Sequence, residues 1–357
     1  MKPTRHILTL VVLFSITSSQ LSYSQKKPKN VVFMIGDGMG LAQVYAAMVA
    51  NGNKLELERC THTGFSKTYS SSHFTTDSGA GGTALACGVK TKNHMIGMSP
   101  DSVAVLSILE EAAKSKLATG LVVACSVTHA TPASFVAHQP DREMNDEIAA
   151  DFLKSDIDVF IGGGRKYFEQ RIDNRNLTNE LKAKKFQIAY TLDDVKSANG
   201  PKLAGLLYDD QNPAMPERGK MLPEATMITI DLLDNNSKGF FLMVEGSQID
   251  WACHNNQLDQ SIKEVLDFDQ TVGKVLDYAQ KSGNTLVIIT ADHETGGLTL
   301  HDGKMGSSDI KHSFSSKVHT GVMVPVYAYG PGAENFTGIM ENTAFKGKIE
   351  KLLGFKK

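Results

Sequence analysis

Short, continuous apolar runs that alternate with helical segments constrain the fold of this chain more than any other feature. The runs span residues 31–35, 121–127, 157–161, 240–244, 286–290 and 324–329. Strands that are apolar along their whole length are buried on both faces, as in a parallel sheet covered by helices. The alternation therefore predicts an α/β fold, a three-layer α/β/α sandwich around a large, mainly parallel central sheet.

Helices are expected between these strands, at residues 41–50, 79–87, 102–116 and 258–279. The segment 174–223 is more polar and less periodic and contains four prolines, so we expect it to be peripheral and near the mouth of a site. The chain shows no evident internal repeat, and its hydrophobic content of 41% can supply a large core. We therefore expect one domain over residues 25–357.

The first 24 residues have the pattern of a secretory signal peptide. Basic Lys2 and Arg5 precede an apolar run at residues 7–16, and cleavage is expected after Ser24. About ten apolar residues are too few to cross a bilayer, so no membrane span is expected. The mature protein is therefore predicted to be secreted or periplasmic.

Charge and cysteine content narrow the partners. The net charge of −2 gives no electrostatic argument for nucleic acid or an anionic membrane surface. The cysteines are Cys60, Cys87, Cys125 and Cys253. One or two disulfides are open to them in an oxidising compartment. Cys125 lies in an apolar run and is expected to be buried, whereas Cys253 lies among hard-oxygen residues and is not favoured as a metal ligand.

Polar side chains follow several of the predicted strands directly. They are Asp37, His129, Thr131, Glu245, Asp250, Asp292 and His293. In open α/β sheets, ligands bind at the carboxyl ends of the strands, so these side chains are expected to meet. Any one of them is explained by an ordinary strand-end turn, but the whole set is not. Clustered carboxylates need cations to offset their repulsion, which predicts a metal site.

The donor types indicate which ions would bind. Clusters of histidine and carboxylate suit zinc, and sets of oxygen donors suit magnesium. The residues that suit one or two zinc-type ions are Asp250, His254, Asp292, His293 and His319. Asp37, Thr131 and Glu245 suit a harder ion. Asp250 and His254 are four residues apart, which places both on one helical face.

Ser78 is the candidate nucleophile, because small residues around one serine allow close approach to a ligand. The alternative is a serine that caps a small-residue helix. The segment lacks both the Gly-x-Ser-x-Gly elbow and a Walker-type lysine, which favours activation by metal over activation by a histidine base. Arg142 offers a planar fork for two phosphate oxygens, and its alternative is an ordinary surface arginine.

Together these segments resemble the alkaline phosphatases, which are metal-dependent phosphate monoesterases. The similar segments span residues 37–40, 76–84, 129–142, 244–254, 290–293 and 319–321. Each is weak alone, but six in the family's order are specific and cover nearly all of the mature chain. The resemblance implies an alkaline-phosphatase-like fold and the hydrolysis of small phosphate monoesters at alkaline pH.

The resemblance also implies a role for each residue. The first zinc would be held by Asp250, His254 and His319, and the second by Asp37, Asp292 and His293. Asp37 would also contact a magnesium ion together with Thr131 and Glu245. Ser78 would form a phosphoserine intermediate, and Arg142 would bind the phosphate. Relatives are commonly homodimers, so a homodimer is also implied.

Two positions depart from the best-known bacterial pattern. His129 stands where those enzymes have an aspartate near the magnesium, and Trp251 stands where they have a lysine. Imidazole suits zinc or cobalt better than magnesium, so the third ion is open between these metals. A phosphodiesterase and a binding protein without turnover remain alternatives. A sulfatase is disfavoured because no Cys-x-Pro-x-Arg motif surrounds Ser78.

Overall fold

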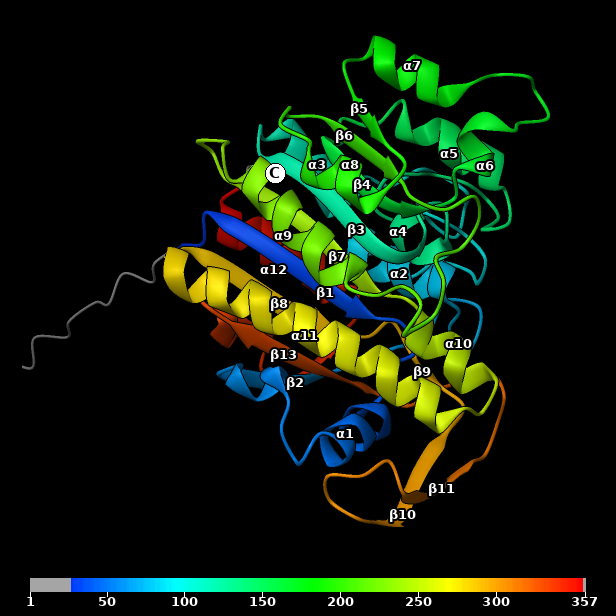
Figure 1. Cartoon of the computed structure of the whole chain (residues 1–357), viewed down its shortest axis with the longest axis vertical. Helices are drawn as coiled ribbons and strands as arrows, with labels where there is room; N and C mark the ends of the chain where they lie inside the picture. Colours follow the sequence, from blue (N-terminus) through cyan, green and yellow to red (C-terminus); the bar gives the residue numbers. More distant parts are fainter. Residues whose placement is uncertain (1–26, 356–357) are drawn as a thin grey trace, which may run out of the picture.

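A ten-stranded sheet runs through the centre of the molecule (Figure 1). The structure, a computed structural model, describes residues 27–355, so the predicted signal peptide lies outside the described residues. The strand order is β14-β2-β13-β8-β1-β7-β3-β4-β6-β5. The bounds are β1 Asn30–Gly36, β2 His62–Lys67, β3 Ala118–Ser126, β4 Val159–Gly163, β5 Gln187–Ala189, β6 Leu203–Leu206, β7 Phe240–Gly246, β8 Thr285–Thr290, β13 Val324–Tyr329 and β14 Gly338–Glu341. Within this sheet only β13 runs antiparallel to its neighbours, so the predicted mainly parallel sheet is confirmed.

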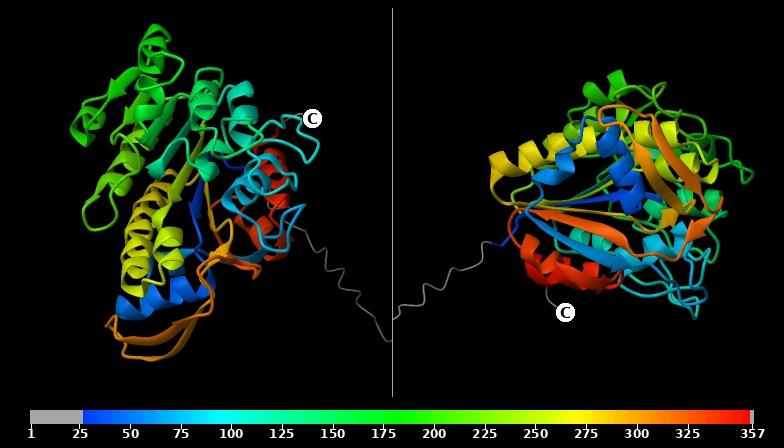
Figure 2. Two further views of the ribbon diagram at one scale, coloured as in Figure 1. Left: turned by 90° about the vertical axis from the view of Figure 1, so that its right-hand side faces the viewer. Right: turned by 90° about the horizontal axis from the view of Figure 1, so that it is seen from below.

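Helices cover both faces of the sheet (Figure 2). One face carries α1 Leu41–Ala50, α9 Met221–Leu233 and α11 Leu258–Ser282. The other face carries α2 Ser78–Cys87, α3 Ile108–Lys114 and α12 Ala344–Leu353. The remaining helices are α4 Ala130–Ala133, α5 Asn145–Phe152, α6 Lys166–Glu169, α7 Leu177–Ala183, α8 Leu192–Lys196, α10 Gln248–His254, η1 Glu56–Arg59 and η2 Ala333–Phe336.

The central strand β1 shows why the sheet needs both helical layers. Val31, Phe33 and Ile35 pack into the core on one face, and Val32 and Met34 pack into the core on the other. Successive side chains of a strand point to opposite faces, so an entirely apolar strand requires two cores. The three-layer α/β/α arrangement predicted from the apolar runs is therefore confirmed.

Two short sheets lie outside the central one. The first pairs β9 Glu294–Thr295 with β12 His319–Thr320, and the second is the hairpin of β10 Leu298–Gly303 and β11 Ile310–Phe314. In the sequence, the strands of both short sheets lie between β8 and β13, which are themselves neighbours in the central sheet. In the part of the chain that the structure describes, no helix is both long enough and apolar enough to cross a membrane.

Two expectations about elements were wrong in detail. The helix expected at 102–116 begins only at Ile108, because Ser107 and Glu110 form a capping box that starts it there. Ser102 has a positive φ of 60°, which is incompatible with a helix.

The segment 174–223 also differs from its prediction. It is peripheral, as expected, but its residues include β5 and β6, which extend the central sheet at one edge. These strands have three and four residues, too few to produce a visible apolar run. Likewise β4 spans residues 159–163 rather than the expected 157–161.

Candidate active site

Side chains from four neighbouring strands meet at the carboxyl end of the parallel strands. Asp37 follows β1, Glu245 lies near the end of β7, and Asp292 with His293 follows β8. Thr131 lies on α4, directly after β3. All five side chains are fully or almost fully buried. The sheet topology therefore brings together residues that are up to 256 positions apart in the sequence.

Asp250, His254 and His319 form the first cluster. The Nε2 atom of His254 lies 3.3 Å from Asp250 Oδ2, and that of His319 lies 3.5 Å from Asp250 Oδ1. The two Nε2 atoms are 3.1 Å apart. Nδ1 of His254 lies 2.6 Å from the carbonyl of Lys317, and Nδ1 of His319 lies 2.9 Å from that of Thr76. Carbonyl oxygens only accept, so both Nδ1 atoms carry protons, and Nε2 is the nitrogen that each ring can offer to an ion when the ring is neutral.

Asp37, Asp292 and His293 form the second cluster, beside the first. His293 Nε2 lies 3.1 Å from Asp292 Oδ2 and 3.5 Å from Asp37 Oδ1. These two carboxylate oxygens are buried and have no hydrogen-bond partner. The ring of His293 stacks on that of His319 at a centroid distance of 3.5 Å, so the two clusters adjoin.

The third cluster lies on the β3 side of Asp37. Glu245, His129 and Cys125 offer ligand atoms that lie within 4.8 Å of one another. Thr131 Oγ1 lies 3.5 Å from Asp37 Oδ2 and connects this cluster to the second one. Glu245 Oε1 and His129 Nδ1 are buried and have no hydrogen-bond partner.

Burial and mutual repulsion shift the pKa values of the carboxyl groups in the three clusters. Burial and the nearby carboxylates of Asp292 and Asp250 raise the pKa of Asp37 well above its usual value. Burial raises the pKa of Asp292 to about 6 and that of Glu245 to about 7. Burial also acts to raise the pKa of Asp250, but hydrogen bonds from His254 and His319 outweigh it and lower that pKa. Cations at these positions would relieve the repulsion among the carboxylates.

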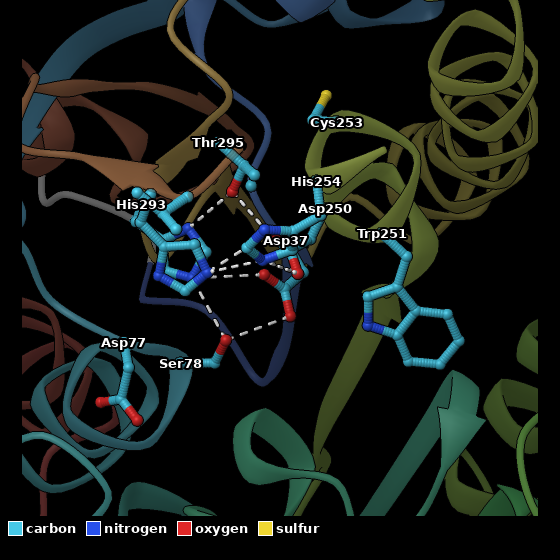
Figure 3. A network of polar contacts seen from close by, with 12 residues as sticks. Asp37, Asp77, Ser78, Asp250, Trp251, Cys253, His254, His293 and Thr295 are labelled. Atoms are coloured by element: carbon cyan, nitrogen blue, oxygen red, sulfur yellow. Dashed lines mark hydrogen bonds and ion pairs between the residues drawn. The ribbon is translucent and has the colours of Figure 1, made fainter. Parts of the chain in front are cut away.

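Ser78 faces the second cluster from the first turn of α2. Its Oγ lies 3.1 Å from His293 Nε2 and 3.5 Å from Asp37 Oδ2 (Figure 3). The alternative of a capping serine is wrong, because Asp77 caps the helix by accepting from the backbone N–H of Ala80. The hydroxyl of Ser78 is therefore free for chemistry at the positive end of a ten-residue helix.

Arg142 is held beside Ser78 by two residues. Its Nη1 donates to Asp77 Oδ2 at 3.2 Å, and its Nη2 lies 3.3 Å from His129 Nε2. Only 16% of the Arg142 side chain is exposed, so the alternative of an ordinary surface arginine is disfavoured. Burial and the nearby Arg142 lower the pKa of His129 to about 3, so this imidazole is neutral.

The two variant positions contact each other. The rings of His129 and Trp251 meet edge to face at a centroid distance of 5.7 Å. Trp251 lies on α10 between the predicted ligands Asp250 and His254 (Figure 3). An aromatic ring therefore packs on the imidazole at the point where the best-known bacterial pattern has a lysine and an aspartate.

Comparison with known proteins agrees with this geometry. The sequence profile described as alkaline phosphatase matches residues 28–313, which is most of the chain. The chain belongs to the alkaline phosphatase family. The fold and enzyme class inferred from the sequence resemblance are thus confirmed, and membership of this family implies bound metal ions.

Individual members of the alkaline phosphatase family match over nearly the whole chain. Alkaline phosphatase 4 of Bacillus subtilis (strain 168) is 35% identical, over 91% of this chain and 88% of its own. The alkaline phosphatase of Escherichia coli (strain K12) is 31% identical, over 94% and 88%. The solved alkaline phosphatase from the Antarctic bacterium TAB5 is 41% identical, covers 93% of this chain and all of its own, and superposes with a TM-score of 0.89.

Three site residues escaped the sequence-based assignment of roles in this alkaline phosphatase family member. Asp77 holds Arg142, and Cys125 donates to Glu245 Oε2 at 3.4 Å. Thr295 Oγ1 donates a short hydrogen bond to Asp250 and lies 3.3 Å from His293 Nδ1, so it links the first two clusters.

Cys125 and His129 belong to the third cluster. The other three cysteines, and the described histidines not named above, take no part in the three clusters. All four cysteines are free thiols, so neither of the disulfides left open by the sequence is present. The ring of His138 lies 3.0 Å from Glu110 Oε1 and 2.7 Å from the Gly97 carbonyl, outside the three clusters.

Proposed function

We propose that this protein hydrolyses small phosphate monoesters to an alcohol and inorganic phosphate through a phosphoserine on Ser78. In the first step the Ser78 Oγ–P bond forms and the bond from phosphorus to the alcohol oxygen breaks. In the second step water adds to phosphorus, the Ser78 Oγ–P bond breaks, and the serine recovers its proton. The overall reaction consumes one water and releases the alcohol and phosphate.

The position of the Ser78 hydroxyl carries this proposal. It projects from the start of α2 toward the second cluster, where its Oγ lies 3.5 Å from Asp37 Oδ2 and 3.1 Å from His293 Nε2. The helix start also directs backbone N–H groups toward an anion at this position. Arg142, fixed by Asp77, would bind two of the non-bridging phosphate oxygens, where charge accumulates during phosphoryl transfer.

The three clusters fit metal ions. The second and third clusters hold buried carboxylate or imidazole atoms without a hydrogen-bond partner, and in the first the ligand atoms of Asp250, His254 and His319 lie within 4.8 Å of one another. We assign Asp250, His254 and His319 to the first zinc, and Asp37, Asp292 and His293 to the second. When bound, such a pair would supply Lewis-acid stabilisation to the oxygens that attack and leave phosphorus. Ser78 faces the second cluster, and the alcohol would depart on the side of the first.

Thr131 and Glu245, together with Asp37, would hold a third ion. Magnesium suits these oxygens, but the neutral imidazole of His129 and the Cys125 thiol beside Glu245 favour zinc or cobalt. A histidine-to-glutamate variant of the Antarctic enzyme is described with magnesium bound in its M3 site. Our assignment is one magnesium, or zinc or cobalt in its place.

Replacing the nucleophile tests the mechanism directly. Ser78→Ala should abolish the covalent phosphoenzyme while leaving the metal content unchanged, because Ser78 is not among the assigned ligands. When the wild-type protein is incubated with ³²P-labelled phosphate and then quenched in acid, the label should be found on Ser78. Label that persists at the same level in Ser78→Ala would refute the assignment.

A pair of substrates separates the alternative functions. We expect rapid turnover of a nitrophenyl phosphate monoester at alkaline pH and slow turnover of the corresponding diester. Arg142 and the third cluster would act on oxygens that a diester has partly blocked. Preference for the diester would indicate a phosphodiesterase, and turnover of neither ester by metal-loaded protein would indicate a binding protein.

We further propose that residues 25–357 form the catalytic domain and that residues 1–24 direct export to the periplasm or the medium. The net charge of the whole chain is −2, so electrostatics gives no reason to propose nucleic acid as a specific partner. A homodimer is proposed from the resemblance to the family. Size-exclusion chromatography with light scattering tests it.

A further inference from the structure

Glu294 is a buried carboxylate with only neutral donors. Glu294 follows His293 directly in the sequence, and only 4% of its surface is exposed. Oε1 accepts from Gln43 Nε2 at 2.8 Å and from the backbone N–H of Leu298 at 3.2 Å. Oε2 accepts from the Gly297 N–H at 3.2 Å and from the hydroxyl of Thr320. Four hydrogen bonds therefore take the place of a positive partner.

These four donors belong to separate parts of the fold. Gln43 lies on α1, and its Nε2 also donates to the backbone carbonyl of Thr295 at 2.9 Å. Gly297 and Leu298 form the entry into β10, and Thr320 lies on β12 next to the predicted ligand His319. Glu294 thus ties a helix of the main body, a hairpin and the strand that carries His319 to one point.

The strand that carries His319 is short, and besides its ladder it is held by the contact of His319 Nδ1 with the Thr76 carbonyl and by the stacking of His319 on His293. β12 and β9 contain two residues each, and their pairing sets His319 opposite Thr295 and Thr320 opposite Glu294. An isolated ladder of this length is too short to be stable without added contacts. The side-chain bond between Thr320 and Glu294 supplies such a contact at the position adjacent to His319.

We propose that Glu294 is a positioning residue that holds His319 in place for metal binding at the first cluster. This inference rests on the metal site assigned above. Glu294 does not reach the ion itself. It fixes β12 so that His319 Nε2 stays near Asp250 Oδ1 and His254 Nε2, which lie 3.5 and 3.1 Å away. Outer residues of this kind tune how firmly a metal is retained.

The carboxylate is required because it only accepts hydrogen bonds. In Glu294→Gln the amide nitrogen would face either the donors Gln43 and Leu298 or the donors Gly297 and Thr320. In either orientation the amide NH₂ group, itself a donor, faces two other donors. The side-chain volume hardly changes, so the substitution removes two of the four hydrogen bonds and the charge without leaving a cavity.

The test measures zinc binding to the full chain, independently of turnover. Chelator-treated protein is titrated with Zn²⁺ in competition with a chromogenic chelator. Glu294→Gln and Thr320→Val should each weaken one zinc equivalent by roughly 10- to 100-fold and leave the other unchanged. Thr320→Ser keeps the hydroxyl and should bind as the wild type does. Glu169→Gln is the matched control, because Glu169 accepts from Thr178 and Tyr190 at the far edge of the sheet.

Three outcomes would overturn the inference. These are wild-type zinc affinity in Thr320→Val, equal weakening of all zinc equivalents, or equal losses in Thr320→Ser and Thr320→Val. The Thr320 pair decides the question even if Glu294→Gln does not fold. A wild-type protein that binds no zinc would instead refute the metal assignment made under the proposed function.

Discussion

Arg142 is oriented by one close carboxylate, that of Asp77, together with its contact to His129. Asp77 Oδ2 accepts from Arg142 Nη1, while Oδ1 caps α2 through Ala80. Asp77→Asn should separate these roles, because an asparagine still caps a helix but no longer offers a charged partner. We expect kcat/KM for a monoester to fall about 10-fold or more, in line with about 1.5–3 kcal/mol for a charged hydrogen bond.

Inhibition by inorganic phosphate measures the binding of phosphate by Arg142 without turnover. The inhibition constant for phosphate should rise in Asp77→Asn. Glu143→Gln is the control, since Glu143 is exposed and lies 3.8 Å from Arg142 Nε. An Asp77→Asn protein with unchanged phosphate inhibition would show that Arg142 does not need Asp77.

His129 should decide which ion the third cluster prefers. It is neutral and buried, with a pKa lowered to about 3 by burial and by Arg142. His129→Asp replaces this imidazole with a carboxylate, which suits magnesium. We expect the variant to retain more magnesium after dialysis and less zinc or cobalt at the third site than the wild type. Metal analysis by mass spectrometry would contradict this if both proteins kept the same ions.

Among the elements, the connection that precedes α9 is clamped to α11 by a buried charge cluster. Arg218 Nη2 pairs with Glu264 and, at 2.9 Å, with Asp267 Oδ2, and these three side chains are at most 2% exposed. The same connection reaches α10 through Gln248, whose Nε2 donates to the Asn212 carbonyl at 2.8 Å. The cluster therefore supports the helix that carries Asp250 and His254.

Arg218→Met should lower the free energy of unfolding by about 3–5 kcal/mol, because it leaves two carboxylates buried without a cation. Urea unfolding monitored by circular dichroism measures the change. Arg165→Met is the control: Arg165 pairs with the exposed Asp209, and such surface pairs contribute at most about 1 kcal/mol. Equal effects of the two substitutions would contradict the special role of the Arg218 cluster.

The elements that sequence predicted well are those with a strong local pattern. The i, i+4 spacing of Asp250 and His254 predicted a shared helical face, and α10 provides it. The short edge strands β5 and β6 escaped notice because three or four residues carry no period. The roles of Asp77 and Glu294 depend on hydrogen bonds between segments far apart in the chain, which one sequence does not display.

For the molecule as a whole, the crowded carboxyl groups predict how the metal-free protein responds to pH. Above about pH 7.5 the unfolded chain holds few protons on its carboxyl and imidazole groups. The folded protein still binds them, because burial raises the pKa of Glu245 to about 7 and raises that of Asp37 well above its usual value. A native state that holds more protons loses stability as the pH rises.

We therefore expect the melting temperature of the metal-free protein to fall between about pH 7.5 and 8.5. Each retained proton corresponds to a loss of up to about 1.4 kcal/mol per pH unit. The lowered pKa values of His293 and His129 act in the opposite direction only below about pH 7.5, where unfolded imidazoles still carry protons. Zinc and magnesium should abolish the decline. Calorimetry of both forms would contradict the prediction if the metal-free protein showed a flat or rising profile.

The position of β1 in the sheet has a consequence for biosynthesis. This strand is made first, yet its neighbours β7 and β8 begin at residues 240 and 285. At roughly 5–20 residues per second, a ribosome needs about 10–40 s to reach them after β1 has emerged. Throughout that interval the nascent chain has no partner for its central strand and cannot close its sheet. Its topology thus delays closure of the sheet until most of the chain has been made.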